Sequence, residues 1–220
     1  MLKRTFDFLT ALAGLAVLAP LLAAVAVLIR FDSSGPVFYR GERVGRHGRA
    51  FRIFKFRTMI VDAEARGGSS TAGDDPRITR VGRWLRRAKL DELPQVFNVL
   101  LGQMSFVGPR PQVRWAVDLY SDEERRLLSV RPGITDYASL RFRNEAEILQ
   151  GADDPDEAYL RLIAPEKIRL GLCYVDHHTL GTDLKIIAVT VLSVAFDING
   201  LRWLNVPEPP RDRQTIRKAA

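Results

Sequence analysis

Two carboxylates stand side by side in the stretch KLDELPQ, where Asp91 and Glu92 come just before Pro94 and an apolar run. Residues 93–101 repeat apolar side chains at the i, i+3, i+4, i+7 spacing of a buried helix face, and Gly102 is a typical stop. The pair therefore falls at a helix N-terminus, where any helix favours acidic residues. Carboxylates kept ionised there can also attack phosphorus or bind a divalent cation. Position alone leaves a capping role and a catalytic role open.

Basic side chains flank this pair on both sides and favour the catalytic role. Arg86, Arg87 and Lys89 come directly before it, and Arg110 follows in the stretch MSFVGPRPQ. The prolines on either side of Arg110 restrict the backbone, which makes the direction of the guanidinium more definite and suits a bidentate grip on a phosphate. Such cations would screen the repulsion between a phosphate and the two carboxylates.

An apolar segment near the start of the chain has the length of a membrane helix. Residues 8–29 carry no charge over 22 positions and would reach roughly 33 Å as a straight helix. A secretory signal has a shorter apolar region, of about 7–15 residues, and ends at a small-residue cleavage site, whereas this segment runs on into Arg30. We therefore interpret it as a membrane anchor.

The course of this anchor has two interpretations. Pro20 lies near its middle, where it removes a backbone hydrogen bond and predicts a bend. Basic residues flank both ends, beginning with Lys3 before the anchor and Arg30 after it, and basic flanks prefer the cytoplasmic side. We expect a re-entrant hairpin that breaks at Ala19-Pro20 and returns. A kinked full crossing is the alternative.

A strongly basic region follows the anchor. Two β-prone aromatic runs, residues 37–40 and 51–58, are separated by a glycine-bearing turn and predict a small hairpin. Between Arg40 and Arg87 the chain has thirteen Lys and Arg against five Asp and Glu. These side chains could hold anionic headgroups or a lipid phosphate, clamp single-stranded nucleic acid, or form a solvated face. We favour lipid phosphate, because the region adjoins the anchor.

The bulk composition agrees with an anionic partner. The formal net charge is +7 and the isoelectric point is near 9.9, which points to nucleic acid, anionic lipid or phosphorylated small molecules. Cys173 is the sole cysteine, so an intrachain disulfide is excluded. Residues 78–90 predict a basic amphipathic helix, which would lie in a membrane interface or pack on the core as an ordinary surface helix.

Three motifs together resemble those of a known family: LDELPQVFNVLLGQMSFVGPRP from Leu90, KFRTM from Lys55 and RPGIT from Arg131. Over about residues 3–190 the chain resembles the bacterial sugar transferases, the monotopic polyprenyl-phosphate phosphoglycosyl transferases. The resemblance implies transfer of a phosphosugar from a UDP-sugar to polyprenyl (undecaprenyl) phosphate, with release of UMP, to initiate glycan or exopolysaccharide assembly. It also implies Mg²⁺ as cofactor and a catalytic domain on the cytoplasmic face of the bacterial inner membrane.

The resemblance assigns roles to individual residues. Asp91 matches the family's nucleophile, which takes the phosphosugar as a covalent intermediate, and Glu92 matches the second carboxylate. Both are expected to be catalytic and to help to hold Mg²⁺. Pro20 matches the family's membrane break. The positions that match substrate-binding or site-adjacent residues of the family are Lys55, Arg57, Arg86, Arg110 and Asp183.

The expected fold is α+β and mostly helical, with a re-entrant membrane helix-break-helix, a small β-hairpin and amphipathic interfacial helices around the active site. We expect a membrane hairpin over residues 1–30, a catalytic domain over residues 31–200 and a flexible or partner-held tail over residues 201–220. The extra N-terminal transmembrane helices of larger relatives are not found in this sequence, so it resembles a catalytic core alone.

Some features lie outside the resemblance. Many members continue PGIT with Gly and an Ala-Gln or Trp-Gln pair, whereas this chain reads DYAS at residues 136–139, which leaves the transferred sugar open. His177 and His178 lack other ligand types at metal spacing, so we expect surface or supporting roles and not a zinc site. A membrane-anchored protein that binds nucleic acid or anionic lipid without catalysis is the alternative function; it would have no need of Asp91.

Overall fold

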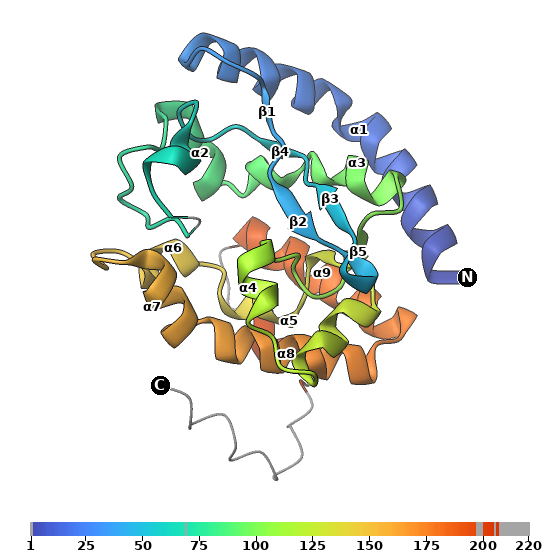
Figure 1. Cartoon of the computed structure of the whole chain (residues 1–220). Coiled ribbons are helices and arrows are strands. Elements are labelled where there is room, and N and C mark those ends of the chain that lie inside the picture. The colour runs from blue at the N-terminus through green and yellow to red at the C-terminus, as the bar shows by residue number, and fades with distance from the viewer. Residues whose placement is uncertain (1, 69, 197–199, 205, 207–220) are drawn as a thin grey trace.

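The computed structural model describes residues 2–68, 70–196, 200–204 and 206 (Figure 1). Its helices and strands are α1 (Leu2–Asp32), β1 (Phe38–Tyr39), β2 (Glu42–Val44), β3 (Ala50–Arg52), β4 (Lys55–Phe56), α2 (Arg80–Arg87), α3 (Gln95–Leu100), β5 (Ser105–Val107), α4 (Arg114–Asp118), β6 (Gly133–Thr135), α5 (Tyr137–Arg141), α6 (Glu145–Ile148), α7 (Pro155–Leu162), α8 (Ala164–His177) and α9 (Leu180–Phe196). The described strands are short and pair two by two. The prediction of a mostly helical α+β fold is confirmed.

The N-terminal apolar segment forms one long helix, α1. It runs without interruption through Pro20, so the predicted helix break at Ala19-Pro20 is wrong. Proline removes one N–H from the helix and pushes against the preceding turn, which bends a helix whose neighbouring turns keep their hydrogen bonds. Figure 1 shows that α1 changes direction along its length. Among the helices of the described residues, α1 alone is long and apolar enough to cross a membrane.

Both ends of α1 contact the same globular body. Near its start, the Lys3 ammonium lies 2.5 Å from the Asp183 carboxylate of α9. Near its end, the Asp32 carboxylate accepts a hydrogen bond of 3.1 Å from the Val81 N–H in α2. The apolar residues of α1 that are buried against the body are Ala11, Leu22, Val25 and Ile29. The helix therefore lies along the body (Figure 1). Leu15, Leu18 and Ala26 are partly buried there, whereas other apolar side chains, such as Leu12 and Val17, are exposed.

The predicted hairpin is present and consists of two short antiparallel pairs. β1 pairs with β4, with Phe38 opposite Phe56, and β2 pairs with β3, with Val44 opposite Ala50. His47, with φ 59°, and Gly48, with φ 73°, adopt left-handed backbone conformations at the tip between β2 and β3. The hairpin brings β4 alongside the turn that carries the two carboxylates.

A parallel pair of strands, β5 and β6, joins two of the sequence motifs. Ser105 lies opposite Gly133, and Val107 lies opposite Thr135. The backbones approach so closely beyond this pair that a Cβ on Gly133 would stand 2.1 Å from the Gly108 nitrogen. The glycines of GPRP and PGIT are therefore explained by this close approach.

The carboxylate motif forms a 3₁₀ turn at Leu90–Glu92 followed by α3. Of the apolar face predicted from the spacing, Val96 is buried, and Leu93, Phe97 and Leu100 are partly buried against the core. Leu101 lies beyond the end of α3 and is exposed. In α2 Leu85 is buried but Trp84 is half exposed.

The C-terminal part of the chain packs on the body through α9 and through residues that follow it. The apolar residues 186–196 form the second half of α9, which packs on the body through Ile186, Val189 and Ser193. Leu201, Leu204 and Val206 pack against the core cluster of α8 and α9. The tail predicted to be flexible or partner-held lies, at residues 205 and 207–220, outside the described residues.

Helix α2 depends on a glycine at its first turn. A Cβ on Gly82 would stand 2.1 Å from the backbone oxygen of Thr58, so α2 rests directly on the chain after β4. The Thr79 hydroxyl caps the helix by accepting from the Gly82 N–H at 3.0 Å. This contact fixes the position of Arg86, whose Nε donates to the Thr58 hydroxyl at 2.9 Å.

We expect Gly82→Ala to lower the free energy of unfolding by about 1–3 kcal/mol, because the added methyl overlaps backbone that cannot rotate away. Gly14→Ala is the matched control: its Cβ would meet nothing within 4 Å, so the free energy of unfolding should stay equal or rise slightly. Chemical unfolding in detergent measures both. Equal stabilities of the two variants would contradict the close contact.

Candidate active site

The centre of the site is the turn that carries Asp91 and Glu92. Lys89, immediately before it, has a left-handed backbone with φ 57°, which ends α2 and starts the 3₁₀ turn in a new direction. Neither carboxylate caps α3 with its side chain, so the capping interpretation does not describe them. Asp91 is 3% exposed, and its Oδ2 lies 2.8 Å from the Nζ of Lys55.

Glu92 lies between two cations. Its Oε1 is 3.4 Å from the Nζ of Lys55 and forms an ion pair with a guanidinium nitrogen of Arg110. The four side chains Asp91, Lys55, Glu92 and Arg110 thus form a row of alternating charge, which we name the charge row. Two like charges can adjoin in sequence because cations from two other segments separate and neutralise them.

The local folding delivers Lys55 to this row. The buried side chain of Asn98 in α3 accepts a hydrogen bond of 2.8 Å from the Phe54 N–H and donates one of 3.0 Å to the Arg52 carbonyl. These two hydrogen bonds hold the segment just before Lys55 against α3, the helix that follows the two carboxylates. Arg110 comes from the loop after β5 and also donates to the Ile134 carbonyl at 3.4 Å.

The charge row keeps Glu92 ionised. Burial alone would raise the pKa of Glu92, but the charges of Arg110 and Lys55 outweigh it, so the pKa lies well below its usual range. Burial alone would lower the pKa of Arg110, but the charge of Glu92 outweighs burial, so the pKa of Arg110 is raised. At neutral pH Glu92 and Arg110 therefore form an ionised pair.

The remaining predicted site residues divide into two groups. Arg86 is close enough to Asp91 and Glu92 to feel their charges, although burial dominates and lowers its pKa. Arg57 instead donates to the carbonyls of Ser33 and Ser34, both at 2.7 Å, just after α1.

Asp183 lies at the other end of α1. It accepts from Lys3 and from the Tyr174 hydroxyl, the latter at 2.7 Å. The structure thus brings Lys55, Arg86 and Arg110 to the carboxylates, while Arg57 and Asp183 hold the two ends of the long helix.

Sequence reasoning missed a buried amide close to the pair. Gln95 is fully buried, and among the described residues neither its Oε1 nor its Nε2 has a hydrogen-bond partner. An unpaired buried amide costs roughly 1–3 kcal/mol, so such groups persist where a water or ligand completes them. The sequence did contain a signal for Gln95, because this residue ends the same stretch, KLDELPQ, that carries the two carboxylates.

The donor set of the turn fits a hard divalent cation. Within the described chain no group of three or more His, Cys, Asp or Glu side chains is placed to enclose a metal. Mg²⁺, however, is commonly bound by one or two carboxylates and completes its shell with water and substrate phosphates. Only Oδ2 of Asp91 and Oε1 of Glu92 meet the row's cations, which leaves each carboxylate a second oxygen for a metal.

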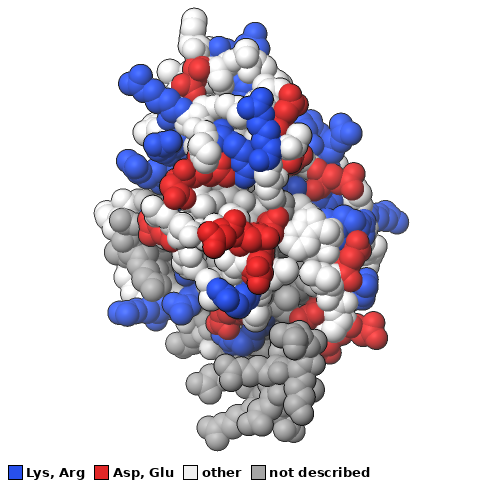
Figure 2. All heavy atoms as spheres, turned by 60° about the vertical axis from the view of Figure 1, so that its left-hand side comes forward, with Lys and Arg blue, Asp and Glu red and all other residues white. Residues whose placement is uncertain are grey.

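The surface charge around the site is mixed. Figure 2 shows basic and acidic side chains interspersed over one face, with acidic side chains gathered near its middle. On this face the basic side chains do not form a continuous positive track, which is the feature that a nucleic-acid backbone requires.

The sequence matches known proteins over most of its length. The family described as bacterial sugar transferase matches residues 1–197. The chain is 41% identical over 201 residues to the exopolysaccharide production protein PSS of Rhizobium leguminosarum bv. phaseoli, an alignment that covers 88% of this chain and 94% of the relative.

Two longer relatives carry more specific names. The chain is 37% identical over 197 residues to the UDP-N-acetylgalactosamine-undecaprenyl-phosphate N-acetylgalactosaminephosphotransferase of Aeromonas hydrophila. It is 38% identical over 204 residues to the undecaprenyl-phosphate glucose phosphotransferase of Komagataeibacter xylinus. These alignments cover 88% and 90% of this chain but 43% and 36% of the relatives, so the chain spans less than half their length.

We expect Glu92→Gln to lower the free energy of unfolding by about 1–3 kcal/mol at pH 7, because it leaves Arg110 without its anion. Since the folded-state pKa of Glu92 is depressed, its stabilisation is complete above the ordinary value of about 4.3 and is lost as the pH falls below it. Chemical unfolding at pH 7, 4 and 3 should show the difference from wild type shrinking.

Glu157→Gln is the control for this pH series. Glu157 is exposed, so its replacement should leave the free energy of unfolding within about 0.5 kcal/mol of wild type at each pH. A difference between Glu92→Gln and wild type that is constant from pH 7 to pH 3 would show that Glu92 is not held ionised by the row.

Proposed function

The chain belongs to the bacterial sugar transferase family, and from that premise we propose that it moves a sugar phosphate from a UDP-sugar to undecaprenyl phosphate. The products are UMP and an undecaprenyl-diphosphate-linked sugar, the starting unit for exopolysaccharide or another glycan. The observation that carries this proposal is the charge row, in which a buried carboxylate pair is matched by cations beside a long apolar helix.

The first half of the reaction uses Asp91 as the nucleophile. One of its carboxylate oxygens attacks the phosphorus that bears the sugar, and a carboxyl–phosphate bond forms. The bond from this phosphorus to the bridging oxygen of the diphosphate breaks, and the oxygen leaves with its electron pair on UMP. Lys55, Arg86 and Arg110 offset the charge that gathers on the phosphate oxygens.

The second half restores the enzyme. An oxygen of undecaprenyl phosphate attacks the same phosphorus, and the bond to the Asp91 oxygen breaks. The electron pair returns to the carboxylate, so neither half requires a net proton transfer. A single carboxylate thereby serves two transfers in sequence.

Mg²⁺ is part of the proposal. Asp91 and Glu92 would hold it through the oxygens that the row's cations leave open. When bound, it would neutralise diphosphate charge and so lower the repulsion that an incoming carboxylate meets.

The membrane arrangement follows from the two ends of α1. Because Lys3 and Asp32 both contact the globular body, we propose that the two ends of α1 face the same aqueous side and that its exposed apolar side chains enter the lipid. The flanking basic residues support the cytoplasm as that side. The bacterial inner membrane is proposed from membership of the family. The helix then sits in one leaflet as a bent, continuous helix, in place of a hairpin.

Asp91→Asn should lower turnover by at least about 10³-fold, because a carboxamide is a poor nucleophile. The same variant should release no UMP when the lipid acceptor is omitted, and its intact mass should show no phosphosugar adduct. Glu92→Gln should lower turnover by about 10²-fold without abolishing it. The assay follows UMP and lipid-linked product from UDP-sugars and undecaprenyl phosphate.

Asp153→Asn is the matched control for the enzymatic assay. Asp153 is exposed, so this variant should turn over like wild type. Full turnover by Asp91→Asn would reject Asp91 as the nucleophile. A membrane-anchored binding protein without catalysis predicts instead that wild type itself shows no turnover and that Asp91→Asn leaves lipid binding unchanged.

The membrane arrangement is tested by labelling single cysteines. In a Cys173→Ala background, Leu2→Cys places a thiol at the first residue of α1 and Arg40→Cys places one after its end. A membrane-impermeant thiol reagent should label both from the cytoplasmic side of sealed vesicles and neither from the other side. Labelling from opposite sides would establish a full crossing.

A further inference from the structure

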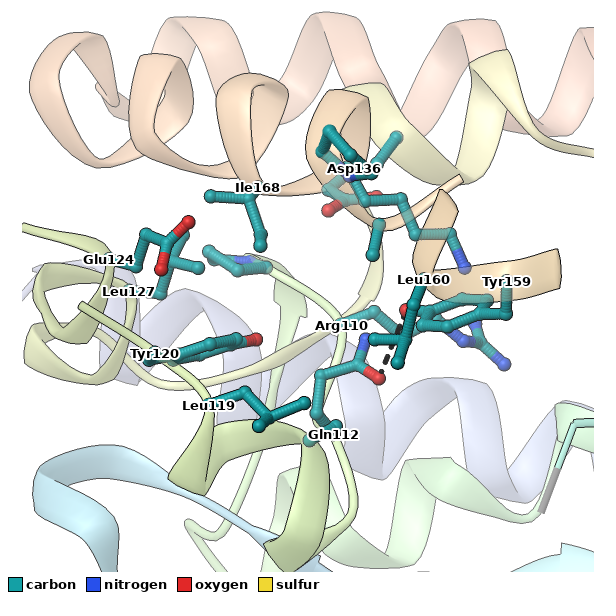
Figure 3. Close-up of a pocket in the computed structure, with 16 residues that line it drawn as sticks. Arg110, Gln112, Leu119, Tyr120, Glu124, Leu127, Asp136, Tyr159, Leu160 and Ile168 are labelled. Atoms are coloured by element: carbon teal, nitrogen blue, oxygen red, sulfur yellow. Dashed lines mark hydrogen bonds between the residues drawn. The ribbon is translucent and has the colours of Figure 1, made fainter. Parts of the chain in front are cut away.

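A cavity of about 330 Å³ lies beside the charge row, enclosed by α4, α7, α8 and the loop after β5 (Figure 3). Its walls combine apolar side chains such as Leu119 and Leu127 with two tyrosines, Tyr120 and Tyr159. The volume is within the range of roughly 300–1,000 Å³ that is typical of pockets for small molecules. Of the residues that match the family's functional positions, only Arg110 lines this cavity, at one end of it. The other lining residues have no role in the reaction proposed above.

Arg110 joins the cavity to the charge row. The contacts place Asp91 first, then Lys55, then Glu92, then Arg110, and the cavity continues beyond Arg110. In a displacement at phosphorus the leaving group departs on the side opposite the nucleophile. With Asp91 and Arg110 at opposite ends of this chain of contacts, a nucleotide that leaves on the side away from Asp91 reaches Arg110 and the cavity.

We propose that this cavity binds the nucleoside end of the donor, with its diphosphate at Arg110. The inference rests on the proposed function, because it assumes a nucleoside-diphosphate sugar as donor. The ribose then lies near Gln112 and Tyr159, and the base lies farther in, near Tyr120 and Glu124. The sugar and its phosphate stay at the Asp91 end of the row.

The place of the cavity in the molecule excludes the lipid as its occupant. Figure 1 shows α4, α7 and α8 on the side of the body away from α1, with the hairpin between them. An undecaprenyl chain has to remain with the apolar helix, whereas the nucleoside is the part of the donor that belongs in water. The cavity therefore faces the compartment from which the nucleotide arrives.

The wall chemistry suits a planar base better than a sugar ring. A base has apolar faces, which stack on aromatic and aliphatic side chains, and polar groups confined to its edges. A pyranose has hydroxyls around its whole rim, and the leucines of this cavity would leave them unpaired.

The wall carries the charged side chains of Arg110, Glu124, Asp136 and Lys167, and its uncharged polar groups are set for nucleoside edges. The Oε1 of Gln112 accepts a hydrogen bond of 3.2 Å from the Tyr159 hydroxyl, which leaves its amide hydrogens to donate (Figure 3). Burial, with a smaller contribution from the Glu124 charge, raises the pKa of Tyr120 to about 12, so its hydroxyl remains a donor at neutral pH. Carbonyl oxygens of a pyrimidine and the ribose hydroxyls would accept from such groups.

Binding of UMP to the full chain in detergent tests the assignment without catalysis. Tyr120→Ala should weaken UMP about tenfold, which corresponds to the loss of one stacking surface, and should leave inorganic pyrophosphate unchanged because Arg110 remains. Tyr120→Phe should bind UMP within about threefold of wild type. Trp203→Ala removes an aromatic side chain that is 60% exposed outside the cavity, and should bind UMP as wild type does.

A second measurement does not depend on the tolerance of Tyr120 to replacement. In the Cys173→Ala background, Leu119→Cys places a thiol at the cavity, where the native side chain is 63% exposed, and Leu162→Cys places one outside the cavity on α7, at a position 50% exposed. UMP should slow alkylation at position 119 at least about fivefold and leave position 162 unchanged. Pyrophosphate should protect neither position.

The outcomes separate this inference from the proposed function. If UMP protects neither thiol and Tyr120→Ala binds UMP like wild type, the nucleoside assignment is overturned, and product formation by the same preparation leaves the proposed function standing. If UMP protects position 119 but neither adduct nor lipid-linked product forms from any UDP-sugar, the proposed function fails while the nucleoside site is upheld.

Discussion

The arrangement of this protein depends on keeping two neighbouring carboxylates ionised in a partly buried turn. Like charges at such a place cannot both persist unless cations stand between and beside them. Lys55 and Arg110 supply those cations from segments far apart in the sequence. The hairpin, the 3₁₀ turn and the loop after β5 must therefore converge, and the Asn98 bonds and the glycine contact between Gly108 and Gly133 are the means by which they do so.

The sequence predicts the chemical groups of the site better than their pairing. Asp91, Glu92 and Arg110 were recognisable because carboxylates, prolines and arginine fall in two short motifs. That Lys55 lies between the carboxylates was not predictable, since it depends on the position of β4 relative to α3. Arg57 shares the KFRTM motif with Lys55, and Asp183 matches a family position, yet their charges meet partners at the ends of α1. Residue type alone does not distinguish a group that binds substrate from one that anchors a helix.

The fold follows the same division. Helix periodicity and turn residues predict α3 and the hairpin well, because local spacing decides them. The break at Pro20 was overestimated, since the turns on either side retain their hydrogen bonds and the body supports the helix at both ends. The parallel pairing of β5 with β6 has no local signature, as it joins segments separated by more than twenty residues.

The ion pair between Lys3 and Asp183 has a consequence for biogenesis. Its partners are 180 positions apart, so a ribosome has produced nearly the whole chain before the pair can close. Before then the start of α1 can dock only on α3 and β5, where the Arg4 guanidinium donates to the Val99 and Leu100 carbonyls at 2.6 and 2.9 Å. Synthesis of the last long helix, α9, thus completes the attachment of the first helix to the body.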